Sequence, residues 1–433
     1  LRSVLQLAPD LRDVVVAGDR LLVSRFRGAS VLVVSRQGVV LAEHRPELRR
    51  FPNLDGEERE YQASVAWRLL ATGDGDAVMV RTMASLTPLD PDSGGYGGDC
   101  DGPTHAEVGV VTANGFQPGF AAPGLARVAL PVDVAQSPDG AHTAVIDATE
   151  GLVAEFDISS FDSGPCGASD STAVFHGHEA EPIAIAYEGS GMLIVQNREP
   201  SRLDLFVRGS RVGKIELGGA SRTDTGHELF HGRGSAATVN GLSCASCHPE
   251  GRDDGHVWTF TGAGPRRSQS LAGTLEGTAP YHWEGDLSDL DALMHEVMAE
   301  RMGASGQSSA RVGALESWLS AVARPVRPSV AFVAAIGSAA RGRDLFYSAE
   351  TQCGDCHSGP MTTNNETVSI GKGRRLQVPS LVGIGTRGPY MHDGCAPTLH
   401  DRFDWLCGGL WHGRTEHLGR PDIDDLVAFM LTL

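Results

Sequence analysis

Two short segments of the sequence share the pattern C-x-x-C-H. They are Cys244-Ala245-Ser246-Cys247-His248 and Cys353-Gly354-Asp355-Cys356-His357. Composition alone predicts about 0.005 chance occurrences of such a pattern. The spacing is that of c-type haem attachment, in which two thiols add to the vinyl groups of the haem and the adjacent imidazole binds the iron. We therefore expect two covalent haems, attached by four thiols and with two histidines as iron ligands: Cys244, Cys247, Cys353, Cys356, His248 and His357.

Two other chemistries use paired cysteines. A structural zinc site needs four ligands, which usually come from two paired motifs. A thioredoxin-type dithiol needs a βαβ setting, and the sequence around these motifs does not predict one. Haem attachment is therefore preferred to both alternatives.

The two motifs belong to an internal duplication. The offset that carries Cys244 onto Cys353 also carries residues 280–285, PYHWEG, onto residues 389–394, PYMHDG. Upstream, residues 226–230, GHELF, correspond to residues 342–346, GRDLF. The duplication predicts two tandem cytochrome c folds, each with a short helix before its motif and a later helix that could supply a second iron ligand.

The elements that must position these motifs are expected to be helical. Thr223 or Asp224 can cap a first helix, and apolar spacing predicts further helices over residues 286–302, 310–322 and 423–433. Before residue 220 the pattern changes to short alternating apolar runs separated by Gly, Asp and Asn, which is typical of antiparallel strands. We expect a multidomain β + α protein, with a β-propeller-like domain over residues 1–220 and all-α cytochrome c domains over residues 221–325 and 326–433.

The strand-rich half contains four similar stretches. They cover residues 13–35, 63–83, 132–158 and 183–207, and residues 86–125 are expected to form a long insertion loop. Repeats of strand, turn and strand at a spacing of about 50 residues resemble YVTN-type or WD-type propeller blades. Four blades rarely close a ring, so either some blades are degenerate or sequence upstream of Leu1 is missing. A β-sandwich with irregular strands is the alternative.

The haem half resembles a known family. Two C-x-x-C-H motifs together with residues 389–394, PYMHDG, and then Thr398-Leu399 resemble the bacterial dihaem cytochrome c peroxidase and MauG family over residues 220–433. The resemblance implies that the first haem binds peroxide or oxygen, that the second supplies electrons, and that a tryptophan lies between them. Trp283 matches that tryptophan; its alternative is a loop residue packed against the core.

The second iron ligands decide the function, because a six-coordinate iron only passes electrons whereas an open position can bind peroxide. The offset places Met302 beside His412, so we expect Met302 at the first haem and His412 at the second. Met302 also continues a stripe with Met294 and Met298 that would suit an ordinary core. The other candidates are His256 and His282 for the first haem, and Met391, His400 and His417 for the second.

The sequence departs from the peroxidase pattern at two places. The stretch 402–406 offers neither the Met nor the Tyr that the family often has after the Thr-Leu pair. Glu300 lies near the position of the family's proton-transferring Glu, but an ordinary exposed helix residue explains it better. Electron transfer is therefore the first expectation. The alternative is a peroxidase-like or oxygenase-like enzyme that acts at the first haem with Trp283 and Glu300.

Charge and the remaining cysteines indicate the surroundings. A net charge of −18 disfavours nucleic acid and anionic membranes, and the expected partner is a redox protein: a small cytochrome, a cupredoxin or a membrane-complex subunit, with docking through the propeller. No run of 18 apolar residues is present, and no secretion signal precedes Leu1, which suggests a processed or truncated chain. Cys395 with Cys407, and Cys100 with Cys166, are the expected disulfides; with covalent haem they predict a bacterial periplasmic or cell-surface location.

Overall fold

We describe a computed structural model of the chain. It covers residues 1–433, except residues 1–4, 6, 74, 93, 95, 98–99, 101, 118, 122, 127, 158–163, 168–173, 178–179, 234–237, 239–240, 274, 371–374 and 408–410. The chain forms two compact units, one of Leu1–Cys247 with Met298–Ser305 and one of His248–Val297 with Gly306–Leu433. The domain boundaries predicted at residues 220 and 325 stay predictions.

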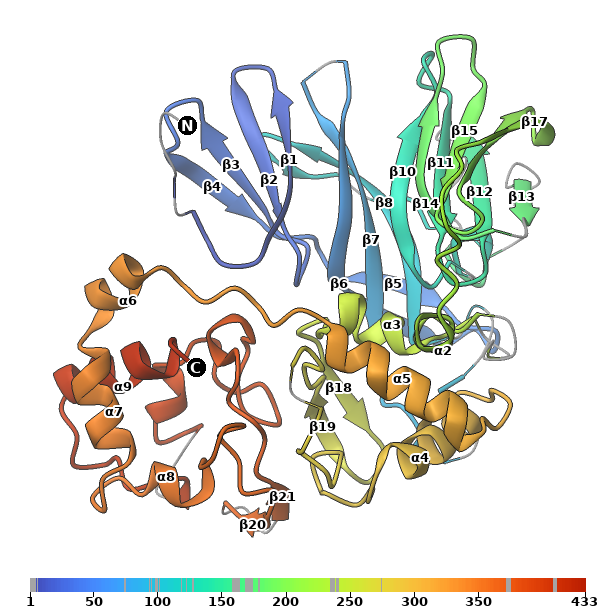
Figure 1. The fold of residues 1–433 in the computed structure, drawn as a ribbon. Coiled ribbons are helices and arrows are strands. Elements are labelled where there is room, and N and C mark those ends of the chain that lie inside the picture. Colours follow the sequence, from blue (N-terminus) through green and yellow to red (C-terminus); the bar gives the residue numbers. More distant parts are fainter. Residues whose placement is uncertain are drawn as a thin grey trace. The chain divides into compact units, whose positions relative to one another are not determined.

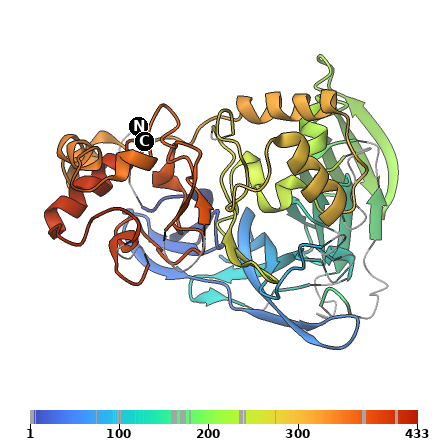
Figure 2. The ribbon, with the colours of Figure 1, turned by 90° about the horizontal axis from the view of Figure 1, so that it is seen from below.

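The first unit consists mainly of antiparallel sheets, drawn from blue to green in Figure 1 and Figure 2. The first sheet has the order β1 (Leu11–Ala17), β2 (Arg20–Arg25), β3 (Val31–Ser35) and β4 (Val40–His44). The second has the order β5 (Arg49–Pro52), β6 (Glu58–Ala71), β7 (Ala77–Ser85), β8 (Thr104–Thr112) and β9 (Gly115–Phe116). The third contains β10 (Pro131–Gln136), β11 (His142–Asp147), β12 (Leu152–Asp157) and β13 (Val174–Gly177). The fourth contains β14 (Pro182–Tyr187), β15 (Leu193–Asn197), β16 (Arg202–Val207) and β17 (Ser210–Glu216).

Each of the four stretches predicted as repeats falls within one of these sheets. The sheets pack face to face: one apolar cluster joins the first two sheets, and another joins the last two. β7 is buried along its whole length, as expected for a strand with packed neighbours on both faces. The stretch 86–125, predicted as a loop, instead contains β8, β9 and the short helix α1 (Pro123–Ala126).

Two aspartates perform the same task in the first and third sheets. Asp13 and Asp133 each follow an irregularity in the first strand of their sheet. The Asp13 carboxylate accepts a hydrogen bond from the Leu69 N–H at 3.0 Å, and the Asp133 carboxylate accepts one from the Ile185 N–H at 2.9 Å. Each bond ties a sheet to the next one along the chain, so the repeat predicted from the sequence extends to side-chain contacts.

The two C-x-x-C pairs lie on short helices. Besides α1, the first unit contains α2 (Thr225–Phe230), capped by Asp224, one of the two predicted caps, and α3 (Cys244–Cys247). In the second unit the segments are η3 (Pro249–Gly251), α4 (Leu290–Leu293), α5 (Ser309–Ala321), α6 (Val330–Ile336), α7 (Ala339–Phe346), α8 (Cys353–Cys356), η5 (Ile384–Thr386), η6 (Asp401–Phe403) and α9 (Arg420–Met430). The π-helix η4 (Met294–Arg301) runs from the second unit into the first.

The prediction of two tandem all-α cytochrome domains is wrong. Each motif is followed by a hairpin, β18 (Val257–Phe260) with β19 (Gly264–Arg267) and β20 (Thr367–Ser369) with β21 (Arg375–Gln377). More of the chain lies in strands than in helices, and most helices are short. These hairpin strands have three or four residues and include Gly and Pro, so they give almost no alternating signal in the sequence.

A helix crossing forms the core of the second unit around the second motif. Gly342 on α7 lies against α9, and a Cβ atom at this position would come within 1.8 Å of the Asp425 carbonyl oxygen. The rings of Phe346 and Phe429 meet edge to face at 5.3 Å in the same contact. The described part of the chain contains no helix long and apolar enough to cross a membrane.

Candidate functional site

Each C-x-x-C pair occupies a single helical turn. Cys244 and Cys247 bound α3, and Cys353 and Cys356 bound α8, so both thiols of a pair project from the same side. None of these four cysteines forms a disulfide. The other four form the two predicted disulfides, which are confirmed: Cys100–Cys166 and Cys395–Cys407.

Burial raises the pKa of three of these thiols. It raises the pKa of Cys244 to about 11 and raises those of Cys353 and Cys356 as well. Catalytic dithiols instead have a lowered thiol pKa, because the thiolate is the attacking species. The surroundings of these cysteines therefore suit thiols that are consumed in covalent attachment better than a redox dithiol.

The two motif histidines share one hydrogen-bond pattern. The Nδ1 atom of His248 lies 3.3 Å from the Arg252 carbonyl oxygen, and that of His357 lies 3.1 Å from the Thr362 carbonyl oxygen. A carbonyl oxygen only accepts, so each Nδ1 carries the proton and donates. This pattern leaves Nε2 with a free lone pair, which is the arrangement of a metal-binding histidine.

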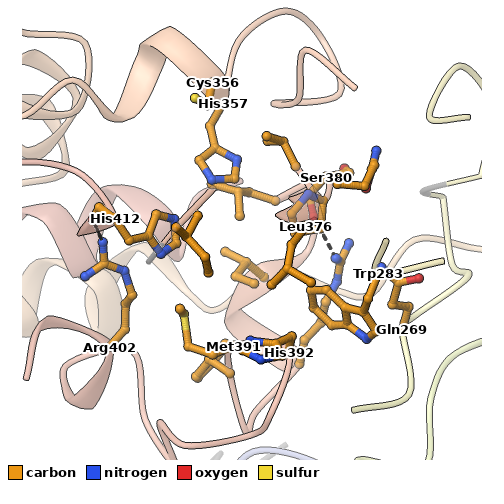
Figure 3. Close-up of a pocket in the computed structure, with 18 of the residues that line it drawn as sticks. Gln269, Trp283, Cys356, His357, Leu376, Ser380, Met391, His392, Arg402 and His412 are labelled. Atoms are coloured by element: carbon orange, nitrogen blue, oxygen red, sulfur yellow. Dashed lines mark hydrogen bonds between the residues drawn. The ribbon is translucent and has the colours of Figure 1, made fainter. Parts of the chain in front are cut away.

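A cavity of about 330 Å³ opens beside the second motif. His357 and His412 both line it, and Figure 3 shows both rings pointing into it. Their ring centroids are 6.1 Å apart. A metal–imidazole bond is about 2 Å long and the ring centroid lies about 1 Å further on, so two imidazoles on one ion have centroids about 6 Å apart. His357 and His412 are thus spaced to hold one iron between them.

Both imidazoles are neutral. Burial lowers the pKa of His357 to about 4, and burial, with Arg402 and His357 nearby, holds the pKa of His412 well below its usual range. Neutral imidazole is the form that binds a metal ion. The position and the neutral form of His412 are therefore compatible with the predicted ligand role, which stays a prediction.

The other candidates for the second haem differ in position. Met391 lines the cavity, in a left-handed backbone conformation with φ of 69°. His400 does not line the cavity, and its Nε2 lies 2.9 Å from a carboxylate oxygen of Asp424. His417 is exposed. Only His412 and Met391 of the predicted set reach the cavity.

Trp283 lies on the cavity wall away from Arg402 (Figure 3). Its indole N–H donates to the Arg267 carbonyl oxygen at 2.8 Å, and its ring meets that of His392 at 6.2 Å. The Arg267 guanidinium pairs with buried Asp253 at 2.9 Å, five residues after His248. Trp283 is therefore held by the segment that follows the first motif and faces the cavity of the second.

The residues predicted for the first haem are spread more widely. Met302 is buried in the first unit with Met298, whereas His248 belongs to the second unit, so their pairing stays a prediction. Glu300 has an exposed side chain. His256 is buried against the ring of Trp258 at 4.5 Å, and His282 lines the cavity, with its Nδ1 atom 3.3 Å from Asp286.

Arg402 is a cavity residue that the sequence did not single out. Its Nη2 donates to the His412 carbonyl oxygen (Figure 3), and its buried Nη1 has no hydrogen-bond partner among the described residues. Burial lowers the pKa of Arg402 to about 10, so the guanidinium stays charged at neutral pH. The sequence signal for Arg402 is its position three residues after Leu399 and next to Phe403, because all three residues line the cavity.

No protein-family model matches the sequence, and no curated protein is significantly similar to it. The similarity to solved structures is low. A hydrazine synthase from Kuenenia stuttgartiensis is 20% identical, with a TM-score of 0.41, over 50% of this chain and 89% of that one. A MauG-like protein associated with microbial copper homeostasis is 20% identical, with a TM-score of 0.36, over 48% and 87%. A virginiamycin B lyase from Staphylococcus aureus is 12% identical, with a TM-score of 0.28, over 49% and 71%. All three TM-scores lie below 0.5, and the proposals below rest on the geometry of the site instead.

Proposed function

We propose that the protein is a dihaem c-type cytochrome that transfers electrons outside the cytoplasm. The observation that carries the proposal is the pair His357 and His412, whose rings lie 6.1 Å apart across a cavity that Cys353 and Cys356 also line. Haem, when bound, supplies one-electron redox chemistry. Cys353 and Cys356 would attach it, and His357 and His412 would hold its iron through their neutral imidazoles.

The first motif shares with the second its two cysteines and the hydrogen bond of its histidine. Its thiols form no disulfide, and the proton of His248 is fixed on Nδ1 by the Arg252 carbonyl oxygen. We propose a second covalent haem here, with Met302 as the other ligand. Trp283 would lie between the two cofactors, because Arg267 links it to the segment that follows His248.

Electron transfer is favoured over peroxide chemistry because His357 and His412 would both bind the iron of the second haem and leave no open position for peroxide. The exposed side chain of Glu300 gives no support to a proton-transfer role in a closed pocket. The two disulfides and the covalent attachment chemistry support a periplasmic or cell-surface location. With a net charge of −18, the proposed partner is a redox protein that presents a basic surface.

Replacement of His412 tests the ligand pair. In His412→Ala the second iron should lose one axial ligand, so its low-spin electron paramagnetic resonance signal should become high-spin while that of the first haem persists. His417→Ala, at an exposed histidine in the same segment, is the matched control and should keep both low-spin signals.

Two results would count against this proposal. An unchanged spectrum of His412→Ala would remove His412 from the iron. A high-spin haem in the untreated wild-type protein that reacts rapidly with hydrogen peroxide would replace electron transfer by the peroxidase-like alternative.

A further inference from the structure

We propose that the buried charge of Arg402 raises the reduction potential of the second haem and so favours its ferrous state. This inference rests on the proposed function, because it needs a haem between His357 and His412. It assigns to Arg402 a positioning and tuning role beside the ligand, not a ligand role.

The first observation is that Arg402 carries its charge into the cavity without a counter-ion. Its Nη2 donates to the backbone of His412, and its guanidinium carbon lies 4.9 Å from the Phe403 ring centroid. No carboxylate of the described residues pairs with it, and its buried Nη1 has no partner there. The residues of the second unit outside the description, 274, 371–374 and 408–410, include no Asp or Glu.

The second observation is that Arg402 lines the same cavity as the residues that would surround the iron. Cys353, His357 and His412 all line this cavity, and the Arg402 guanidinium reaches the backbone of His412. A cation beside these three residues would also act on an ion held between the two imidazoles.

The consequence for the iron follows from Coulomb's law. Reduction adds one electron to the ferric iron and lowers the charge of the site by one. A fixed cation nearby opposes the ferric state more than the ferrous state, and it does so strongly where water is excluded. Salt screens a buried charge much less than an exposed one, so the effect should persist at high ionic strength. Two imidazole ligands set a lower potential than a Met and His pair, and Arg402 would partly offset that difference.

The test is a potentiometric titration of the holoprotein, with the second haem identified as the component altered in His412→Ala. We expect Arg402→Gln to lower the midpoint potential of the second haem and to leave that of the first haem unchanged. Arg402→Lys, titrated at pH 6 with its ammonium group protonated, should stay close to wild type. Arg414→Gln removes an exposed charge two residues from His412 and should change neither potential.

Each result separates the inference from the proposed function. An unshifted second potential in Arg402→Gln, in a protein that keeps two haems and low-spin ligation, would overturn the tuning role alone. Equal shifts in the Gln and Lys variants would show that the fit of the side chain, and not its charge, sets the potential, and would overturn it too. Wild-type protein without covalent haem would overturn the proposed function itself.

Discussion

At the scale of single residues, one buried histidine outside the candidate site is expected to destabilise the folded protein in acid. His105 is fully buried in the first unit, near the rings of Tyr61 at 4.5 Å and Phe51 at 6.0 Å. Neither of its ring nitrogens has a hydrogen-bond partner among the described residues. Burial, with Arg49 and Arg81 nearby, lowers the pKa of His105 to about 3.

This lowered pKa predicts acid sensitivity. The unfolded chain binds the proton near pH 6.5, whereas the folded chain resists it down to about pH 3. The stability that neutral His105 contributes is therefore complete above pH 6.5 and falls by about 1.4 kcal/mol per pH unit below it. His105→Phe should lose this dependence, measured as the difference in free energy of urea unfolding between pH 7 and pH 5.

His142→Phe provides the control, because His142 is exposed in the same unit and should keep the wild-type dependence. Equal pH dependence in His105→Phe and wild type would show that His105 does not stay neutral in the folded protein.

At the scale of elements, the crossing of α7 and α9 depends on one glycine. A methyl group on Gly342 would overlap the Asp425 carbonyl oxygen at 1.8 Å, and backbone cannot move aside as a side chain can. Gly342→Ala should therefore destabilise the protein by about 1–3 kcal/mol or more. Gly313 in α5 has nothing within 4 Å of an added Cβ atom, so Gly313→Ala should stabilise by about 0.5–1 kcal/mol.

Thermal unfolding of both variants checks this prediction. The two substitutions are chemically identical and both lie within helices, so any difference between them comes from the contact with α9. Equal melting temperatures for Gly342→Ala and Gly313→Ala would contradict the tight crossing.

The elements also show what the sequence could predict. The spacing of apolar residues predicts α5 and α9 to within a few residues. Thr223 and Asp224 are both candidate caps in the sequence, because a short polar side chain is the usual partner of free N–H groups at a helix start, and the structure has Asp224 in this role. The duplication marked Gly342 and Phe346 as equivalent to Gly226 and Phe230, yet it could not show that Gly342 meets α9, because that contact joins segments about 80 residues apart. The helix predicted over residues 286–302 begins later, at Leu290, and continues as the π-helix η4.

In the candidate site, too, local features could be predicted from the sequence and contacts between distant segments could not. Cysteine and histidine spacing identified the attachment residues, because that chemistry is local in sequence. Arg402 was missed because its importance depends on an absent counter-ion and on the backbone of His412, neither of which leaves a pattern in the chain. The hairpins after each motif were missed because strands as short as Thr367–Ser369 leave no measurable periodicity.

At the scale of the whole molecule, the chain forms two compact units that differ in their secondary structure. The first unit stacks four antiparallel sheets whose neighbours are tied by Asp13 and Asp133. The second unit holds the second motif, its cavity and the two facing imidazoles. The first motif bridges them in sequence, since its thiols belong to the first unit and His248 to the second.

The intact mass of the denatured protein, prepared with a periplasmic haem-attachment system, tests the central claim most directly. Covalent haem survives denaturation, so the wild-type mass should exceed that of the polypeptide by two haem groups. Replacement of Cys353 and Cys356 by Ala should remove one of them, while replacement of Cys395 and Cys407 by Ala should remove none. A wild-type mass equal to that of the bare polypeptide would contradict the proposal that this is a dihaem c-type cytochrome.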